Sequence, residues 1–258
     1  LDDEININLK NKISNFKYGD IVLLENIRYY KEEINNNETF AKVLASFGDI
    51  YINDAFSCCH RKQASIHEIA KQINSCFAGP LLKKELSSIN MILEDKKKPI
   101  TCILGGSKIS TKIKIINNLV KTAQNIYLVG AMANNFFLYQ GHKVGKSLIE
   151  QNTKKLIEEI YSNAQKFDCK IFVPIDCIVS KNFTKIGNKK NVDEIDNEDI
   201  VLDIGPKTLD NLIKKIESSK TILWNGPAGY FENSHFAEGT NLIAKKISSL
   251  TAQGKILS

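Results

Sequence analysis

The residues best suited to bind phosphate follow a short apolar, strand-like run, Ile100 to Leu104. Gly105-Gly106-Ser107-Lys108 comes next, and a helical pattern then continues through Lys112. Two glycines let the backbone approach an anion closely, and the N–H groups that begin a helix favour negative charge. Lys108 and Lys112 are four residues apart, so they share one helix face and could reach the same oligophosphate. The pattern predicts a phosphate site, and the alternative is a glycine turn with two solvated lysines.

Two other glycine patterns fail as nucleotide motifs. The segment Gly141-His142-Lys143-Val144-Gly145-Lys146-Ser147 is similar to a P-loop, but three residues separate its glycines where that motif needs four. It also follows a helical pattern rather than a strand. No strand is followed by the G-x-G-x-x-G fingerprint of dinucleotide-binding folds. Neither motif is therefore assigned.

Two arginines lie just past the carboxyl ends of predicted strands. Arg28 follows the run 21–24, and His60-Arg61 lies beyond the run 50–52. Open α/β sheets bind ligands at this edge, and guanidinium groups match phosphate or carboxylate oxygens. The two arginines predict an anionic substrate. A surface ion pair is the alternative for each arginine alone, and a structural role is the alternative for His60.

A glycine-punctuated loop follows the late strand pattern at 221–224. It reads Asn225-Gly226-Pro227-Ala228-Gly229-Tyr230-Phe231-Glu232. Such a loop at the carboxyl end of a strand can form one wall of a nucleotide pocket, with the Glu232 carboxylate available for ribose hydroxyls. We take it as a weak signal by itself.

The elements that must position these residues alternate between strand-like and helical patterns. Apolar, β-branched runs also occur at 126–129, 171–175 and 200–204, and 3.6-residue periodicity lies between the runs, as in Phe40 to Phe47. Strand and helix in alternation predict parallel sheets with crossover helices. The predicted fold class is therefore α/β, with two doubly wound parallel-sheet (Rossmann-like) domains.

One long amphipathic helix, Leu81 to Glu94, breaks the alternation. It follows Gly79-Pro80 and is closed by the polar run Asp95-Lys96-Lys97-Lys98-Pro99, because proline cannot continue a helix and lysines suit a helix C-terminus. We predict a first domain over residues 1–80, an interdomain helix over 81–95 and a second domain over 96–258.

Composition is that of an ordinary globular protein, with 258 residues, 43% apolar, 25% charged and a net charge of +6. The lysines are spread along the chain and no basic-aromatic interleaving occurs, so we expect no nucleic-acid partner. No run is long enough to span a bilayer, and the six cysteines form no C-x-x-C pair. We expect reduced thiols and a cytoplasmic protein. The start at Leu1 and the strand-like end at Ser258 suggest a chain cut at both ends.

Taken together, the motifs resemble the phosphoglycerate kinase family over nearly the whole chain. The matching stretches, in order, are LLENIRYYKEE, GDIYINDAF, HRKQAS, GPLLKKEL, ILGGSKISTKI, VGAMANNF, GKSL, DIGPKT and WNGPAGYFE. The resemblance implies an N-terminal domain that holds 3-phosphoglycerate, a C-terminal domain that holds Mg-ADP or Mg-ATP, and hinge bending that joins them. It implies a monomer acting on these small molecules in glycolysis.

The resemblance also assigns roles to residues. Arg28, His60 and Arg61 match substrate-binding positions, and Arg28 and Arg61 are also expected to act in catalysis. Lys108 matches the lysine that stabilises the transferred phosphoryl group, and Lys112 the lysine that reaches the nucleotide phosphates. The further nucleotide-binding positions are Gly105, Gly106, Gly130, Asn225 and Glu232. No protein ligand to a metal is expected, because Mg²⁺ would be carried by the nucleotide.

Some positions depart from the family pattern. Ala131 stands where many relatives have a third glycine, Tyr29-Tyr30 replaces a Phe-His pair, and Gln63 replaces a common histidine. The family's N-terminal D-x-N and H-x-G-R segment and its C-terminal G-G-G-D-T loop do not occur in the chain. We therefore expect the isolated chain to be inactive and its first domain to be poorly soluble or partly molten. A nucleotide-binding module without catalysis and an NAD-dependent dehydrogenase are the alternative functions.

Overall fold

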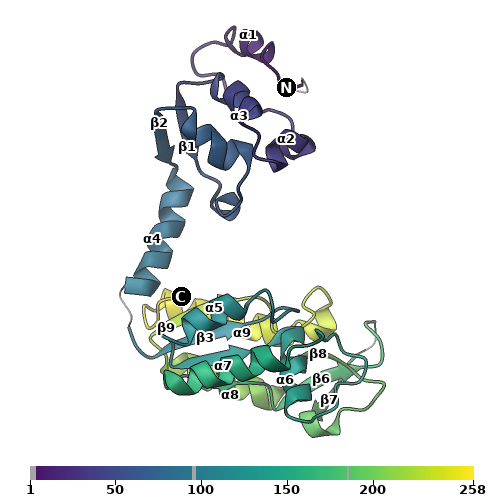
Figure 1. Ribbon diagram of the computed structural model, residues 1–258. Helices are drawn as coiled ribbons and strands as arrows, with labels where there is room; N and C mark the ends of the chain where they lie inside the picture. Colours follow the sequence, from purple (N-terminus) through teal and green to yellow (C-terminus); the bar gives the residue numbers. More distant parts are fainter. Residues whose placement is uncertain (1–3, 95–96, 185) are drawn as a thin grey trace. The chain divides into compact units, whose positions relative to one another are not determined.

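The chain divides into two compact units, Leu1–Leu93 and Glu94–Ser258 (Figure 1). The computed structural model describes residues 4–94, 97–184 and 186–258. The predicted interdomain helix is α4 (Pro80–Glu94), and it groups with the first unit. Asp95 and Lys96, from the polar run expected to close this helix, lie outside the described residues.

The first unit packs short helices against a small sheet. Its other elements are α1 (Leu9–Ile13), η1 (Ile27–Tyr29), α2 (Lys31–Ile34), α3 (Glu38–Ala45), β1 (Ile50–Asn53), η2 (Phe56–Cys58), η3 (Ala64–Glu68), η4 (Ile69–Lys71) and β2 (Ser75–Ala78). The strands β1 and β2 are parallel neighbours. Phe40 and Leu44 of α3 are buried in the core of this unit, where Tyr30 stacks on Phe40 with ring centroids 5.2 Å apart.

One predicted strand of this unit is absent, and one observed strand was not predicted. Residues 21–26 form no strand, and the side chain of Ile21 is 96% exposed, because the two-stranded ladder of this unit is made by β1 and β2 instead. The strand β2 was not predicted from its Ser75-Cys76-Phe77-Ala78 sequence, which lacks a β-branched run. It leads into α4, whose first turn is capped by Asp54, because the Asp54 carboxylate accepts the Leu82 N–H at 2.9 Å.

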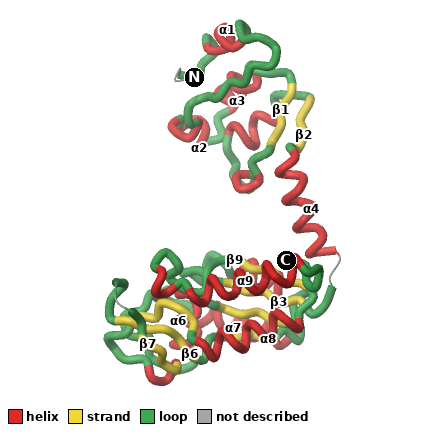
Figure 2. The backbone as a smooth tube through the Cα atoms, turned by 180° about the vertical axis from the view of Figure 1, so that it is seen from behind, coloured by secondary structure: helices red, strands yellow, loops and turns green. Residues whose placement is uncertain are grey.

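The second unit is a larger α/β assembly, seen from two sides in Figures 1 and 2. Its strands are β3 (Ile100–Leu104), β4 (Asn125–Leu128), β5 (Lys170–Phe172), β6 (Asp176–Ser180), β7 (Asn188–Asn191), β8 (Ile200–Ile204) and β9 (Thr221–Asn225). Its helices are α5 (Ile113–Leu119), η5 (Gly130–Met132), α6 (Ala133–Tyr139), α7 (Lys154–Lys166), η6 (Val192–Glu194), α8 (Pro206–Ser218), η7 (Ser234–Phe236) and α9 (Glu238–Ala252).

The main sheet is parallel, in the order β5-β4-β3-β9. Alternate residues of its central strands point to opposite faces. Cys102 and Leu104 of β3 pack with the buried side chains of α5, α6 and α7, whereas Ile103 packs with those of α8 and α9. Helices therefore cover both faces, which confirms the predicted parallel α/β class and explains why β3 is apolar throughout.

A second sheet was not foreseen. The run at 200–204 was predicted as a strand of a parallel sheet, but as β8 it pairs antiparallel with β6, which also pairs antiparallel with β7. The error has a physical cause, because a short apolar run does not reveal its pairing partner. The buried Asp176 at the start of β6 accepts the Lys207 and Thr208 N–H groups, at 2.9 and 2.8 Å, and so caps α8.

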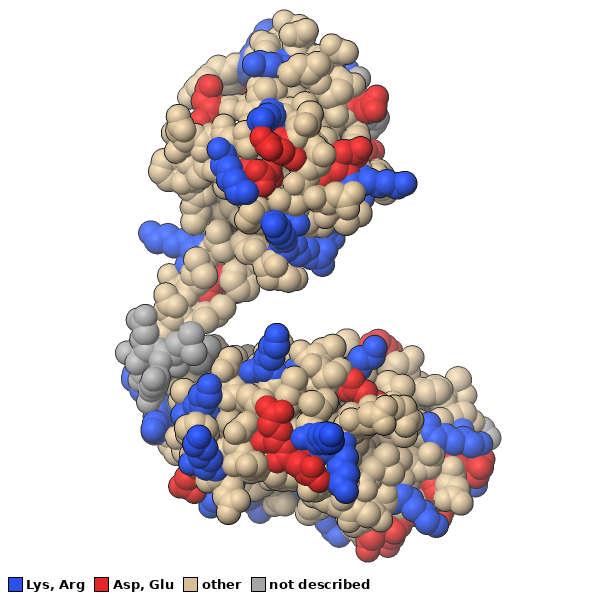
Figure 3. Space-filling model, in the orientation of Figure 1, with Lys and Arg blue, Asp and Glu red and all other residues tan. Residues whose placement is uncertain are grey.

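Surface charge, cysteine state and helix length agree with what the composition predicts. Lysine and arginine side chains are interspersed with acidic ones on the face drawn in Figure 3. All six cysteines are free thiols. Within the described part of the chain, the helices are too short or too polar to cross a membrane.

Candidate functional site

Three loops meet at the carboxyl ends of three adjacent parallel strands, β4, β3 and β9. The Gly105 N–H donates to the Asn225 carbonyl at 2.9 Å, and the Gly130 N–H donates to the Ala228 carbonyl at 3.0 Å. A third bond, from the Met132 N–H to the Gly106 carbonyl at 2.7 Å, joins the loops after β3 and β4. Backbone hydrogen bonds thus join the three glycine-containing loops to which the sequence analysis assigned nucleotide binding.

These loops leave no room for side chains where they touch. A Cβ on Gly105 would lie 2.0 Å from the Pro227 carbonyl oxygen, and one on Gly130 would lie 3.0 Å from the Gly106 nitrogen. Gly130 and Gly106 also have φ values of +68° and +126°, which favour glycine. Bare backbone therefore forms one side of the site.

A cavity of about 540 Å³ opens beside the three loops. Its lining combines backbone from the glycine loops with apolar side chains from other elements, among them Phe137 of α6, Leu148 and Leu202 of β8. Its polar groups include Glu232 and Asp203. A largely apolar pocket of this size with a few polar groups suits a flat aromatic ligand that also carries hydrogen-bonding groups.

The two predicted lysines occupy different surroundings. Lys112 is partly buried at the start of α5, and its Nζ donates to the Oδ1 and, at 3.4 Å, to the carbonyl oxygen of Asn225. Burial lowers the Lys112 pKa. Lys108 is exposed on the loop after Gly106, and its ammonium makes no hydrogen bond or ion pair within the described residues. The structure thus brings Lys112 and Asn225 together, whereas among residues 4–94, 97–184 and 186–258 it shows no hydrogen-bond or ion-pair partner for the Lys108 ammonium.

The expected phosphate cradle at the helix start is only partly present. The helix α5 begins at Ile113 rather than directly after Lys108. The Ser110 N–H, which the sequence pattern would aim at an anion, instead donates to the Glu150 carboxylate at 3.1 Å. The Ser110 donors are therefore already hydrogen-bonded to the protein's own Glu150.

The predicted substrate residues lie in the first unit. Arg28 lies in η1, and its Nη2 donates to the Cys58 Sγ at 3.0 Å. The Cys58 carbonyl accepts the Arg61 N–H at 2.9 Å, so one residue joins the two arginine-bearing loops. Arg28, His60 and Arg61 are exposed. Their common role in binding an anion stays a prediction.

Sequence reasoning missed Asp203, an acid within the apolar run Ile200-Val201-Leu202-Asp203-Ile204. It lines the cavity and is only 3% exposed. Its oxygens accept the N–H groups of Ile204 and Gly239, each at 2.8 Å, so that it also caps α9. Burial raises the Asp203 pKa to about 6, although the two N–H groups oppose this and Glu238 adds to it. The available signal was a single carboxylate in an otherwise apolar strand.

This pKa predicts a specific pH dependence of stability. Because the folded-state pKa of Asp203 is above its unfolded value, the folded state binds more protons, and the free energy of unfolding should fall as pH rises from about 4 to about 6. The expected loss is about 3 kcal/mol. Urea unfolding followed by Trp224 fluorescence should show it as a pH-dependent difference between wild type and Asp203→Asn. Parallel pH profiles for the two proteins would contradict the assignment.

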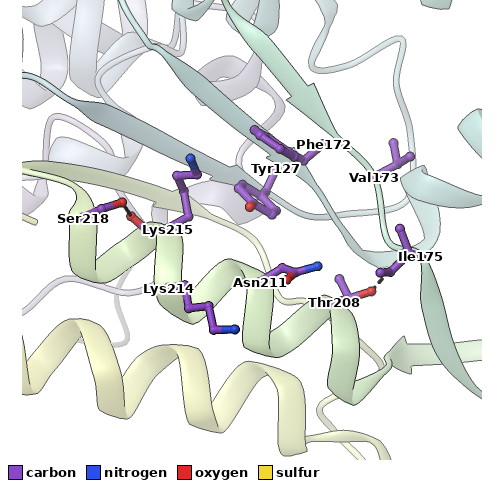
Figure 4. A pocket seen from close by; sticks show the side chains of 9 residues that line it. All are labelled: Tyr127, Phe172, Val173, Ile175, Thr208, Asn211, Lys214, Lys215 and Ser218. Carbon is purple, nitrogen blue, oxygen red and sulfur yellow. Dashed lines mark hydrogen bonds between the residues drawn. The ribbon is translucent and has the colours of Figure 1, made fainter.

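A second cavity, of about 440 Å³, lies between the β5 region and α8. Figure 4 shows Tyr127 and Phe172 on the sheet side and Lys214 and Lys215 on the helix. The Lys215 ammonium is 5.6 Å from the centre of the Phe172 ring. No predicted site residue lines this cavity, so it is separate from the candidate site.

Comparison with known proteins decides the family. A family model described as phosphoglycerate kinase matches residues 1–258. The chain belongs to the phosphoglycerate kinase family. This confirms the resemblance drawn from the nine sequence motifs, and it removes the basis for reading the fold as that of a dehydrogenase.

Individual relatives agree. The chain is 46% identical over 259 residues to the phosphoglycerate kinase of Wolbachia pipientis subsp. Culex pipiens (strain wPip), covering 100% of the chain and 65% of the relative. It is 41% identical over 250 residues to that of Dictyoglomus turgidum, covering 96% and 63%. The chain therefore spans slightly less than two thirds of the length of these relatives.

Solved structures of the family share the fold. The structure of phosphoglycerate kinase from Coxiella burnetii matches with a TM-score of 0.76 and 34% identity, over 87% of this chain and 58% of that one. The phosphoglycerate kinase from Pyrococcus horikoshii OT3 matches with a TM-score of 0.81 and 26% identity, over 95% and 64%. Both likenesses support the α/β architecture described above.

Proposed function

We propose that the full-length protein containing this chain is a phosphoglycerate kinase. It transfers a phosphoryl group reversibly from 1,3-bisphosphoglycerate to ADP, giving 3-phosphoglycerate and ATP in glycolysis. The observation that carries the proposal is the meeting of the Gly105, Gly130 and Asn225 loops beside one cavity, in a chain of this family. We further propose a monomer, in the cytoplasm, with these small molecules rather than nucleic acid or membrane as its partners.

The cavity of the second unit supports a nucleotide site. Its apolar walls suit an adenine ring, and the Glu232 carboxylate is available for ribose hydroxyls. The Lys112 ammonium donates to Asn225, two residues before Pro227 of the cavity lining, and this supports the proposal that it binds the nucleotide phosphates. Bare glycine backbone at Gly106 and Gly130, which line the cavity, allows close approach of the ligand, and Gly105 lets the loop after β9 pack beside them.

The chemistry proposed for the chain's residues is charge neutralisation and alignment. Phosphoryl transfer between a carboxylate and ADP needs no protein nucleophile, and positively charged groups around the transferred group stabilise its transition state. Lys108 supplies such a charge from the second unit. Arg28, His60 and Arg61 in the first unit bind the anionic 3-phosphoglycerate and help to neutralise it. No protein group forms a covalent intermediate in this scheme.

We propose that Mg²⁺ binds together with the nucleotide, through its phosphates. Among residues 4–94, 97–184 and 186–258, no group of three or more His, Cys, Asp or Glu side chains could hold a metal ion. Mg²⁺ usually keeps several waters and binds through one or two carboxylates together with substrate phosphates. The described side chains do not form a cage for it.

A coupled spectrophotometric assay of the full-length protein tests the activity. ATP should be consumed in the presence of 3-phosphoglycerate, and omission of either substrate should abolish turnover. Binding of ADP without turnover would instead favour a nucleotide-binding module without catalysis.

The variant Lys112→Ala tests the nucleotide assignment. It should weaken ADP binding about tenfold or more, because a charge-assisted hydrogen bond to phosphate contributes roughly 1.5 to 3 kcal/mol. Isothermal titration calorimetry measures the dissociation constant. Lys114→Ala, which removes an exposed lysine of α5, is the matched control and should leave it unchanged. Equal affinities for wild type and Lys112→Ala would contradict the assignment.

A further inference from the structure

The backbone that follows Lys108 is held by one carboxylate from a distant loop. The Ser110 hydroxyl and the Ser110 N–H both donate to Glu150, the N–H at 3.1 Å. These contacts lower the Glu150 pKa, the hydroxyl bond first, with smaller contributions from the N–H groups of Ser110 and Ile109 and from the charge of Lys108, while burial opposes them. Glu150 therefore holds Ser110, two residues after Lys108, by both its hydroxyl and its N–H.

The segment that carries Glu150 is itself hydrogen-bonded to α6. Its N–H donates to the Oδ1 of Asn135 at 3.0 Å, and Asn134 Nδ2 donates to the Leu148 carbonyl at 3.0 Å. Both asparagines are buried on α6, with 2% and 0% exposure. The segment 148–150 is thus hydrogen-bonded to two buried side chains of α6. The helix α6 directly follows the Gly130 loop of the candidate site.

The loop that carries Lys108 is consequently fixed on its C-terminal side in two ways. The side chain of Ile109 is fully buried in the core, and the next residue is bonded to Glu150. On the N-terminal side, Gly105 and Gly106 are bonded to the neighbouring loops. The Lys108 side chain is exposed on this backbone, between the anchored Gly106 and Ile109.

The hydrogen bonds from Ser110 to Glu150, called the brace below, could serve either global stability or the position of Lys108. Exposed or half-exposed hydrogen bonds to a carboxylate contribute little to global stability. A charge that must meet a transferring group, by contrast, has to be held closely, because a displacement of about 1 Å can cost on the order of 10²-fold in rate. Glu150 is partly exposed, so the second role explains the arrangement better.

We propose that Glu150 is a positioning residue for Lys108, acting through the Ser110 hydroxyl and the backbone of the loop. The proposal rests on the proposed kinase function, in which Lys108 stabilises the transferred phosphoryl group. Glu150 is not among the residues that line the cavity beside the glycine loops. It sets where the Lys108 ammonium lies when the substrates are bound.

A double-mutant cycle in the full-length protein tests this. Glu150→Ala should lower kcat by roughly 10- to 100-fold and change the KM for ATP by less than about threefold. Glu150→Gln retains an acceptor for Ser110 and should keep most of the activity. In a Lys108→Ala background, Glu150→Ala should cost nothing further, because the brace then has no ammonium to position.

A control is available in another carboxylate of the second unit that accepts a side-chain hydrogen bond. Glu159 of α7 accepts a hydrogen bond from Asn117 of α5 at 2.6 Å, away from the Lys108 loop. Glu159→Ala removes the same kind of charge and one hydrogen bond to α5, and it should leave kcat unchanged. If Glu150→Ala lowers kcat by the same factor with and without Lys108, its role is structural and the proposal is overturned.

Hydrogen exchange separates this proposal from the function on which it rests. Amide exchange of the segment 107–112 should be faster in Glu150→Ala than in wild type or Glu159→Ala, whether or not the protein turns over. An inactive wild type would overturn the proposed function, and with it the catalytic purpose of the brace. Unchanged exchange in Glu150→Ala would overturn the brace itself, even in an active kinase.

Discussion

Replacing Lys108 with alanine in the full-length protein should lower kcat by roughly 10²- to 10³-fold while changing ADP affinity much less. The physical reason is the difference between two neighbouring lysines. The Lys112 ammonium is partly buried and bonded to Asn225, whereas the Lys108 ammonium makes no hydrogen bond or ion pair within the described residues. An ammonium that no direct hydrogen bond holds within the described residues is free to meet charge that develops during transfer.

Steady-state kinetics and calorimetry together check this prediction. Lys108→Ala should leave the ADP dissociation constant within about threefold of wild type, since the lost interaction acts mainly in the transition state. Lys112→Ala should show the reverse, with weaker binding and a smaller effect on kcat. Lys114→Ala serves again as the control. A Lys108→Ala protein that binds ADP poorly but turns over normally when saturated would reverse the two assignments.

Gly105→Ala should be the most destabilising single change among the site glycines. Its Cβ would lie 2.0 Å from the Pro227 carbonyl oxygen and 2.8 Å from the Gly226 carbonyl carbon, both backbone atoms. Relief requires the loops after β3 and β9 to separate, which would also break the 2.9 Å bond from the Gly105 N–H to Asn225. We expect a loss of about 3 kcal/mol in the free energy of unfolding, together with weaker ADP binding.

A second glycine isolates the steric effect. Gly141 has a φ of +88°, but no atom lies within 4 Å of the position its Cβ would occupy. Gly141→Ala should therefore cost only the backbone strain of about 1 kcal/mol. Urea unfolding followed by Trp224 fluorescence compares the two variants. Equal losses would show that the contact with Pro227 is not what makes Gly105 necessary.

The sequence by itself determined the local arrangement of the phosphate motif. The β-branched run Ile100–Leu104 forms a strand with the predicted bounds, and Gly105, Gly106 and Lys108 follow its carboxyl end. Strand propensity and glycine at a close backbone approach are local properties, so a short window suffices to read them. The collinear motifs likewise determined the family, which the comparison confirmed.

Only the tertiary structure decided which distant residues meet. Asn225 lies 113 residues from Lys112, and Ser110 lies 40 residues from Glu150, so neither hydrogen bond has a periodicity or spacing that could indicate it. The role of Asp203 could not be predicted for the same reason. It caps α9 by accepting the Gly239 N–H, and Gly239 approaches it only in the folded chain. The antiparallel pairing of β8 with β6 also escaped prediction, since an apolar run shows that a strand is buried but not against which neighbour it will pair.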